Sequence, residues 1–164
     1  MILRGFFCKM ISRGDGMVIY KQGDLFQDDA EAFVNAVNVV GVMGAGIALQ
    51  FKKRYPDMFE AYEKACSDGE LQLGKMHVYE REKDDPKYII NFPTLHHYRD
   101  KSKLSDIEAG LQDLVEVVKK HNIQSIAIPP LGCGAGGLAW EDVKQLIEEA
   151  FSKEDITVHL YEPM

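Results

Sequence analysis

The sequence predicts an α/β fold in which helices cover both faces of a mostly parallel β-sheet. Strand-like and helix-like segments alternate along the 164 residues, and this alternation is typical of the class. Residues 123–128 are apolar apart from Gln124 and Ser125, as expected of a strand covered on both faces. Two glycine-rich loops, Gly41–Gly46 and Gly132–Gly137, each follow an apolar run and precede a helical pattern.

The first half of the chain is expected to contain four strands and two helices. Pro56 ends one helix and begins the next, because proline is tolerated in the first turn of a helix but not in its interior. Phe59, Tyr62 and Cys66 then share one face of the second helix. The expected elements are strands at 17–20, 32–37, 75–79 and 88–92, a helix at 47–54, and a helix from Pro56 to near Gly69.

The second half is expected to contain two amphipathic helices and two strands. Ser105–Glu108 fits a capping box, in which the serine side chain caps a helix and the glutamate bonds back to it. Apolar residues at helical spacing predict the two helices. The expected elements are a helix with the stripe Ile107, Leu111, Leu114, Val115 and Val118, a strand at 123–128, a helix with the stripe Trp140, Val143, Ile147 and Phe151, and a strand at 156–160.

Composition and charge restrict the function classes. The chain is 46% hydrophobic and 27% charged, which is ordinary for a soluble globular domain. Its net charge of −7 argues against broad binding to nucleic acid and leaves only contact at a local basic patch. No window is long and apolar enough to span a membrane. Residues 1–16 are expected to form a disordered extension, or to be present because a start codon upstream of Met17 was chosen in place of Met17.

The cysteines indicate a reducing environment. Cys8, Cys66 and Cys133 are widely spaced, and no two of them form a C-x-x-C pair. A disulfide framework or a zinc ribbon is therefore not expected, and a cytoplasmic location fits this usage best. The adjacent His96 and His97 are poorly placed to share one metal ion, so no metal site is expected.

The two glycine-rich loops predict phosphate binding through the backbone. Such a loop offers unpaired N–H groups and the positive end of a helix dipole. The first loop has no Lys-Ser or Lys-Thr after its glycines, which excludes a P-loop, and its glycines at 41, 44 and 46 do not fit G-x-G-x-x-G. Two such loops in one domain suggest a clamp for a ligand with more than one phosphate.

Ligands of α/β folds bind at the carboxyl ends of the strands. The segments expected there share amides, backbone N–H groups and one acid, without a nucleophile–base pair. They are Gly23–Phe26, Asn35–Asn38, Gly41–Gly46, Asn91–Arg99 and Gly132–Gly137.

Several residues in these segments also have purely structural interpretations. Asp24 is either a ligand residue or a turn residue. Asn35 is better interpreted as a cap of the following turn. For Asn38 the same cap is an alternative to ligand binding. Cys133 is interpreted as a small packed residue, although a nearby helix N-terminus would lower its pKa. Trp140 is expected to anchor the core.

Four motifs occur in order along nearly the whole chain. They are Gly23–Leu25, Val34–Asn38, Gly41–Ala48 and Ile128–Gly137. In this order they resemble the signature of the macro domain, a family that binds ADP-ribose and often hydrolyses ADP-ribosyl bonds. The resemblance implies a three-layer α/β/α sandwich with a mixed, mainly parallel sheet, formed by residues 17–164.

Within this family the sequence is most similar to antitoxins that act as DNA ADP-ribosyl glycohydrolases. The segments that carry this similarity are Gly41–Gly44, Ala48–Phe51, Asn91–Thr94, Ser102–Leu104 and Pro129–Gly134. The resemblance implies that the partner is ADP-ribose or an ADP-ribosylated substrate, either DNA or protein. It implies neither a cofactor nor a metal.

The resemblance also implies roles for individual residues. Asp24 would accept a hydrogen bond from the adenine amino group, and the Leu25 amide would contact the ring. Asn38, the residue assigned to catalysis, would hold the distal ribose beside the scissile carbon. The diphosphate and distal ribose would be wrapped by Gly44, Ala45, Gly46, Ile47, Thr94, Gly132, Cys133, Gly134, Ala135, Gly136 and Gly137.

The sequence departs from the family at both known catalytic positions. The antitoxin-like members have a lysine directly after Asn-Phe-Pro-Thr, where this chain has Leu95. The one-domain glutamate-ADP-ribose hydrolases have an aspartate in the second glycine loop, where this chain has Gly136. Lys101 or Lys103 would have to reach in from the following loop, or water held by the diphosphate would attack unaided. Hydrolysis, recognition of ADP-ribose without catalysis, and deacetylation of O-acetyl-ADP-ribose therefore all stay open.

Overall fold

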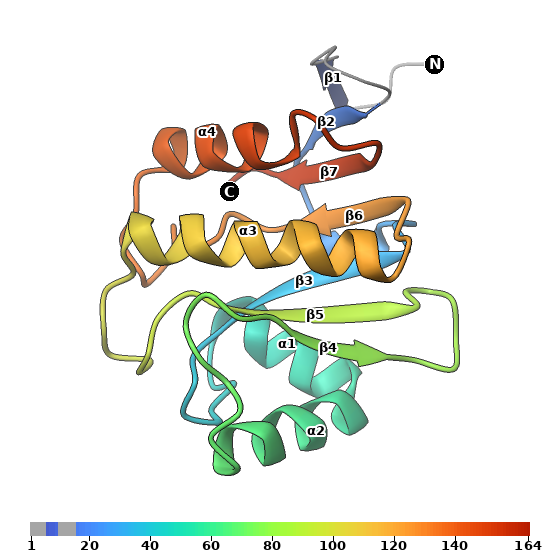
Figure 1. Cartoon of the computed structure of the whole chain (residues 1–164). Coiled ribbons are helices and arrows are strands. Elements are labelled where there is room, and N and C mark those ends of the chain that lie inside the picture. The colour runs from blue at the N-terminus through green and yellow to red at the C-terminus, as the bar shows by residue number, and fades with distance from the viewer. Residues whose placement is uncertain (1–5, 10–15) are drawn as a thin grey trace.

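The computed structural model describes residues 6–9 and 16–164, which form a seven-stranded sheet with helices on both faces (Figure 1). The strand order is β1-β2-β7-β6-β3-β5-β4. The five central strands are parallel, whereas β1 and β4 pair antiparallel with β2 and β5 at the two edges. The strands are β1 (Phe6–Lys9), β2 (Met17–Lys21), β3 (Ala32–Val37), β4 (His77–Glu80), β5 (Tyr88–Pro93), β6 (Ser125–Ile128) and β7 (Thr157–Tyr161).

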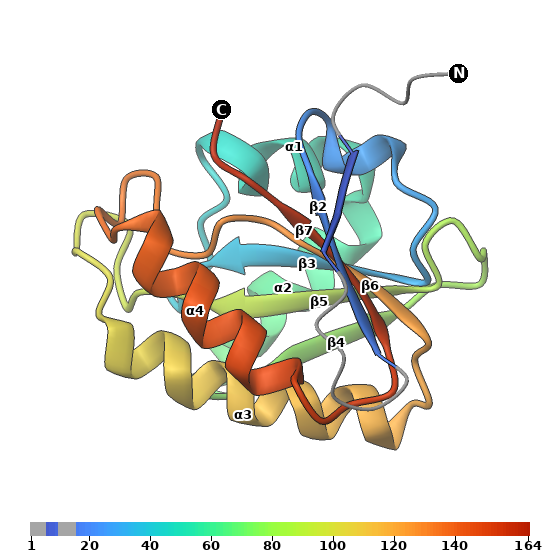
Figure 2. The same cartoon turned by 90° about the horizontal axis from the view of Figure 1, so that it is seen from above.

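Two pairs of helices enclose the sheet, which gives the expected three-layer sandwich (Figure 2). The pair α3 and α4 covers one face, and the pair α1 and α2 covers the other. Within the described part of the chain, no helix is both long and apolar enough to cross a membrane. The helices are α1 (Gly46–Arg54), α2 (Pro56–Ser67), α3 (Leu104–Lys120) and α4 (Trp140–Phe151).

Two hydrophobic cores follow from this layering, one on each face of the sheet. Alternate residues of a strand point to opposite faces, so Val34 of β3 packs toward α3 and α4 while Phe33 packs toward α1 and α2. Apart from Trp140, the predicted apolar stripes of α3 and α4 are buried as expected, including Leu114 and Ile147, each with 0% of its surface exposed. Trp140 is only partly buried and packs at the border of its core.

The predicted capping box at Ser105–Glu108 is wrong. Helix α3 begins at Leu104, and the N-cap residue is Lys103, which makes no side-chain cap hydrogen bond. The backbone N–H groups of Asp106 and Ile107 bond to the Lys103 carbonyl. Leu104 packs against the core and the helix starts two residues earlier than the capping box implies, so Ser105 lies inside the first turn, where its hydroxyl is not placed to cap it.

The prediction of a disordered extension is wrong for Phe6–Lys9. These four residues form β1, which pairs antiparallel with β2 in the register Phe6 to Lys21. Residues 1–5 and 10–15, which belong to the same predicted extension, lie outside the described residues. The sheet therefore has one more edge strand than the sequence indicated.

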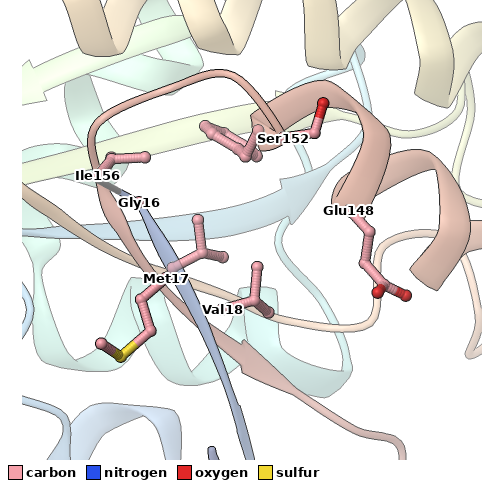
Figure 3. Close-up of a pocket in the computed structure, with 8 residues that line it drawn as sticks. Gly16, Met17, Val18, Glu148, Ser152 and Ile156 are labelled. Atoms are coloured by element: carbon pink, nitrogen blue, oxygen red, sulfur yellow. The ribbon is translucent and has the colours of Figure 1, made fainter. Parts of the chain in front are cut away.

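A small cavity lies beside Gly16, between the start of β2 and the end of α4 (Figure 3). Its volume is about 10 Å³, and its lining includes Met17, Glu148 and Ser152. A space of this size holds about one water molecule. It is therefore a packing defect rather than a ligand site.

Candidate functional site

A cleft of about 570 Å³ opens at the carboxyl ends of β3, β5 and β6. This volume lies in the range of sites for small ligands. The loops that follow these strands gather at one end of the sheet (Figure 2), as the parallel topology requires. The two glycine loops both line the cleft, so they are walls of one site as the sequence predicted.

The structure brings most of the predicted site residues together in this cleft and leaves four of them out of its lining. The predicted residues that line it are Asn38, Gly44, Ala45, Gly46, Ile47, Thr94, Gly132, Gly134, Ala135 and Gly136. The predicted residues that do not are Asp24, Leu25, Cys133 and Gly137. Sequence reasoning missed Pro129 and Pro130, although their position directly after the β6 strand was a usable signal.

The first glycine loop leads into the N-terminus of α1. Ala45 occupies the N-cap position and has no side-chain oxygen to satisfy the first N–H groups of the helix. The first turn of α1 contains no acidic residue, and Gly46 and Ile47 line the cleft. The positive end of the helix dipole and its N–H groups therefore belong to the cleft, where they favour an anion.

Asn38 holds the first glycine loop in shape. Its Nδ2 donates to the Val42 carbonyl at 2.7 Å, and its Oδ1 accepts from the Val40 N–H at 3.0 Å. The buried Tyr62 hydroxyl lies 2.8 Å from the Asn38 carbonyl and 2.9 Å from its Oδ1. The structural alternative for Asn38, a cap of the following turn, is thus present, and contact with the distal ribose stays a prediction.

The interpretation of Asn35 as a turn cap is wrong, because Asn35 lies inside β3 and is completely buried. Its Nδ2 donates to Asn91 Oδ1 at 3.1 Å, across the register that pairs these two residues. Asn91 Nδ2 in turn lies 3.1 Å from His77 Nδ1 on β4. Burial lowers the pKa of His77, which favours the neutral ring in this polar network between strands.

The second glycine loop is held by the segment that follows Thr94. The Ser102 N–H donates to the Gly136 carbonyl at 3.0 Å, and Lys101 Nζ donates to the Ala135 carbonyl at 3.0 Å. A Cβ atom at Gly136 would lie 2.4 Å from Ser102 Oγ and 2.7 Å from the Gly132 carbonyl oxygen. The loop therefore leaves no room for a side chain at Gly136 in this conformation.

Cys133 is a packed residue, as expected from the sequence. Its side chain packs against the core on the α3 and α4 side, and its Sγ lies 3.5 Å from the Leu131 carbonyl. Burial raises the pKa of Cys133 to about 11. The thiol is therefore protonated near neutral pH and is a poor nucleophile.

Asp24 lies at the end of β2, outside the lining of the cleft. Its Oδ1 accepts from the Phe26 N–H at 2.9 Å and caps a single turn of 3-10 helix, η1 (Leu25–Gln27). The Leu25 side chain is buried in the core on the α1 and α2 side. Arg54 lies over the Phe26 ring at 4.4 Å. The turn role of Asp24 is thus present, and its contact with adenine stays a prediction.

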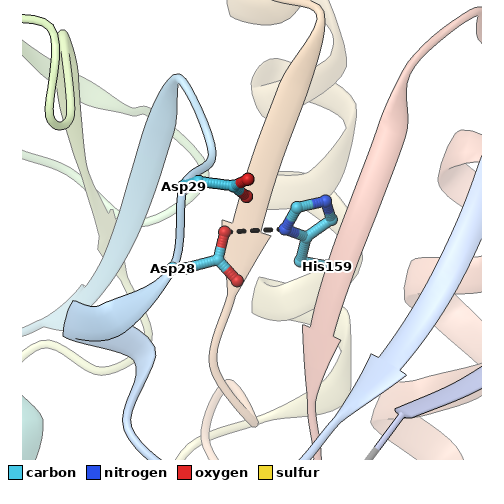
Figure 4. A group of neighbouring side chains, drawn as sticks. All are labelled: Asp28, Asp29 and His159. Atoms are coloured by element: carbon cyan, nitrogen blue, oxygen red, sulfur yellow. Dashed lines mark hydrogen bonds and ion pairs between the residues drawn. The ribbon is translucent and has the colours of Figure 1, made fainter. Parts of the chain in front are cut away.

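A buried carboxylate, Asp28, lies beside His159 and Asp29 (Figure 4). Asp28 accepts from Tyr161 at 2.6 Å and from Lys21 at 3.0 Å, and its Oδ1 lies 2.6 Å from His159 Nδ1. Burial alone would raise the pKa of Asp28, but these hydrogen bonds hold it well below its usual range. The hydrogen bonds of Asp28 give this cluster a structural role, because they join the segment before β3 to β2 and β7.

Comparison with known proteins gives consistent matches over this chain. The Macro domain family model matches residues 34–147. A DNA ADP-ribosyl glycohydrolase of Mycobacterium tuberculosis is 56% identical over 149 residues, which are 90% of this chain and 42% of that protein. The chain thus spans about two fifths of the length of this relative.

Two solved structures have the same fold. The macrodomain of Mycobacterium tuberculosis DarG has a TM-score of 0.89 and 56% identity, and the match covers 91% of this chain and 99% of that one. Thermosipho africanus DarTG in complex with ADP-ribose has a TM-score of 0.86 and 34% identity, over 96% of this chain and 44% of that one.

Proposed function

The chain belongs to the macro domain family, and from this membership we propose that its cleft binds ADP-ribose and hydrolyses the bond between ADP-ribose and a base of DNA. The observation that carries the proposal is the joint lining of one cleft by two glycine loops, one of which opens a helix. Backbone N–H groups and a helix dipole suit a diphosphate. The relative from Mycobacterium tuberculosis supports the DNA substrate by its name, DNA ADP-ribosyl glycohydrolase.

We assign each part of ADP-ribose to residues in or near the cleft, beginning with the diphosphate. The diphosphate is bound by backbone groups of Gly44–Ile47 and Gly132–Gly137. Asn38 lies beside the distal ribose, with Thr94 next to it in the lining. Asp24 accepts a hydrogen bond from the adenine amino group, because a carboxylate is a strong acceptor for an exocyclic amine.

The proposed reaction breaks the bond between the anomeric carbon of the distal ribose and the base. The base leaves with the bonding electron pair and takes up a proton, while a water oxygen bonds to the anomeric carbon and loses a proton. Such a transition state has oxocarbenium character. Its positive charge is favoured beside the bound diphosphate, so positioning and electrostatics lower the barrier even without a general acid.

Recognition of ADP-ribose without catalysis is the second candidate function, and Leu95 favours it. Leu95 lines the cleft at the position where the antitoxin-like members have a lysine. Leucine has no proton to donate, and the loss of one general acid–base group lowers a rate by roughly 10²–10⁴-fold. We keep hydrolysis as the leading function because the Mycobacterium tuberculosis relative, which is 56% identical over 149 residues, is named a DNA ADP-ribosyl glycohydrolase.

The proposal includes an antitoxin-like role, in which the protein removes ADP-ribose from DNA. We further propose a cytoplasmic location, because the three cysteines form no C-x-x-C pair and the described Cys66 and Cys133 are free thiols.

The test is release of ADP-ribose from an ADP-ribosylated single-stranded oligonucleotide, measured by chromatography with the protein below substrate concentration. We expect the wild type to release several equivalents, Leu95→Met to match it, and Leu95→Lys to be roughly 10²-fold faster or more. Absence of multiple turnover by the wild type would overturn the hydrolase proposal. Release by Leu95→Lys alone would then identify a recognition module that has lost its lysine.

A further inference from the structure

The exposed apolar side chains of the described residues gather at the mouth of the cleft. Apart from Met164 at the end of the chain, the large apolar side chains with substantial exposure are Val40, Val42 and Tyr98. Val42 and Tyr98 line the cleft, and Val40 belongs to the turn that Asn38 caps. Tyr98 is 47% exposed. Exposed apolar side chains that line a site indicate a contact with a ligand or partner.

Tyr98 belongs to an ordered turn that presents two aromatic rings. The ring centroids of His97 and Tyr98 lie 4.0 Å apart at an angle of 32°, and the Arg99 guanidinium lies 5.7 Å from the Tyr98 ring centre. The His97 N–H donates to Asp100 Oδ2 at 3.0 Å, and the Arg99 N–H donates to His97 Nδ1 at 3.1 Å. These bonds fix the turn and the His97 ring, against which the Tyr98 ring packs, so a ligand that stacks here finds the surface already formed.

The same segment is locally basic although the whole chain has a net charge of −7. Between residues 96 and 103 it carries Arg99, Lys101 and Lys103 against the single acid Asp100. Lys101 bonds to Ala135 in the wall of the cleft, which fixes the basic segment beside the site. Cations beside aromatic rings are the combination that binds single-stranded nucleic acid.

The apolar rim suits a planar base better than an acidic side chain. Leu95, Val42 and Tyr98 all line the cleft and offer contact area without a charged group. A carboxylate placed among these three side chains would lose water without a charged donor from any of them. A base, in contrast, has two apolar faces that stack on an aromatic ring.

We propose that Tyr98 is the stacking surface for the base that carries ADP-ribose, and that Arg99 and Lys103 contact phosphates of the same single DNA strand. This inference rests on the proposed function, because it names the residues that hold the remainder of the substrate. A single strand is required because a base stacked inside a duplex does not reach a surface ring. Tyr98 is thereby a specificity-determining residue, and ADP-ribose itself is bound elsewhere in the cleft.

The experiment compares dissociation constants for free ADP-ribose and for an ADP-ribosylated single-stranded oligonucleotide, the latter by stopped-flow anisotropy before hydrolysis. The dissociation constant for ADP-ribose divided by that for the oligonucleotide gives the factor by which the DNA part tightens binding. We expect this ratio to fall about 5- to 100-fold in Tyr98→Ala, which is the range for loss of one base–aromatic stack. Tyr98→Phe is the matched control and keeps the ratio, because it keeps the ring.

A ratio that is the same in Tyr98→Ala and the wild type would overturn the inference, as would a wild type that binds the oligonucleotide no more tightly than ADP-ribose. A wild type that does not bind ADP-ribose at all would instead refute the proposed function. The phosphate contacts are tested with Arg99→Gln and Lys103→Gln. Each is expected to reduce the slope of log K against log salt concentration by about 0.7, and an unchanged slope would remove that residue from the proposed contact.

Discussion

Replacement of Gly136 by alanine tests whether close packing keeps this position of the second glycine loop free of a side chain. The added Cβ would lie 2.4 Å from Ser102 Oγ and 2.7 Å from the Gly132 carbonyl oxygen. Contacts under 3.0 Å essentially do not occur for real Cβ atoms. Rotation of the Ser102 hydroxyl relieves the first contact, but the backbone oxygen of Gly132 moves only if the loop moves.

The expected cost follows from this overlap. Overpacking of a closely packed site costs about 1–3 kcal/mol, and in a domain of this size each kcal/mol lowers Tm by about 2–4 °C. Gly136→Ala is therefore expected to lower Tm by about 2–12 °C and to weaken ADP-ribose binding, because Gly136 lines the cleft.

Gly134→Ala is the matched control. Gly134 belongs to the same loop and lines the same cleft, but no atom lies within 4 Å of a Cβ placed there. Neither glycine has a positive φ, so backbone strain does not distinguish them. Thermal unfolding followed by circular dichroism compares the two variants. Equal Tm values for Gly136→Ala and Gly134→Ala would refute the packing argument, and partial recovery in Gly136→Ala with Ser102→Gly would support it.

Two further predictions concern the residues that hold the site in shape. Asp28→Asn is expected to destabilise the protein by about 3–5 kcal/mol at pH 7, because it removes the buried negative charge that pairs with Lys21 and His159. Hydrogen bonds lower the pKa of Asp28 in the fold, so this stability is present above the unfolded pKa of about 4 and is lost progressively as the pH falls below it. Urea unfolding at pH 7 and pH 3 should therefore show a smaller difference in the free energy of unfolding between variant and wild type at pH 3. An equal difference at both pH values would contradict the linkage. Tyr62→Phe removes the hydroxyl that donates to Asn38 and is expected to cost about 1–2 kcal/mol and to weaken ADP-ribose binding by loosening the first glycine loop. An unchanged affinity by calorimetry would show that this support is dispensable.

The sequence was sufficient for the layers of the fold and for the two walls of the cleft. Both are local signals: a period of 2 or 3.6 in apolar residues, and glycines at a strand-to-helix junction. The boundaries of α1 and α2 agree with the expectations to within one or two residues, and α4 contains the whole predicted stripe. The expected place of the two loops follows from the rule that parallel strands end at one edge of the sheet.

The errors concern contacts between residues that are distant along the chain. The local pattern around Asn35 predicts a turn cap, whereas its partner Asn91 lies 56 positions further on, across the sheet. The sequence does not indicate the role of Ser102, since its contact with Gly136 depends on two loops meeting in space. No local pattern shows such a contact before the topology is known. The capping box was a local pattern that the packing of Leu104 overrode.

Calorimetric titration with ADP-ribose tests the central claim most directly, namely that the cleft between the two glycine loops binds this ligand. The wild type is expected to bind one ADP-ribose per chain. Asp24→Ala is expected to bind about 10- to 100-fold more weakly, because a hydrogen bond to a charged group contributes about 1.5–3 kcal/mol. Equal binding by Asp24→Ala would remove only the assignment of Asp24 to adenine. An absence of any heat of binding in the wild type at millimolar ADP-ribose would contradict the account of the cleft itself.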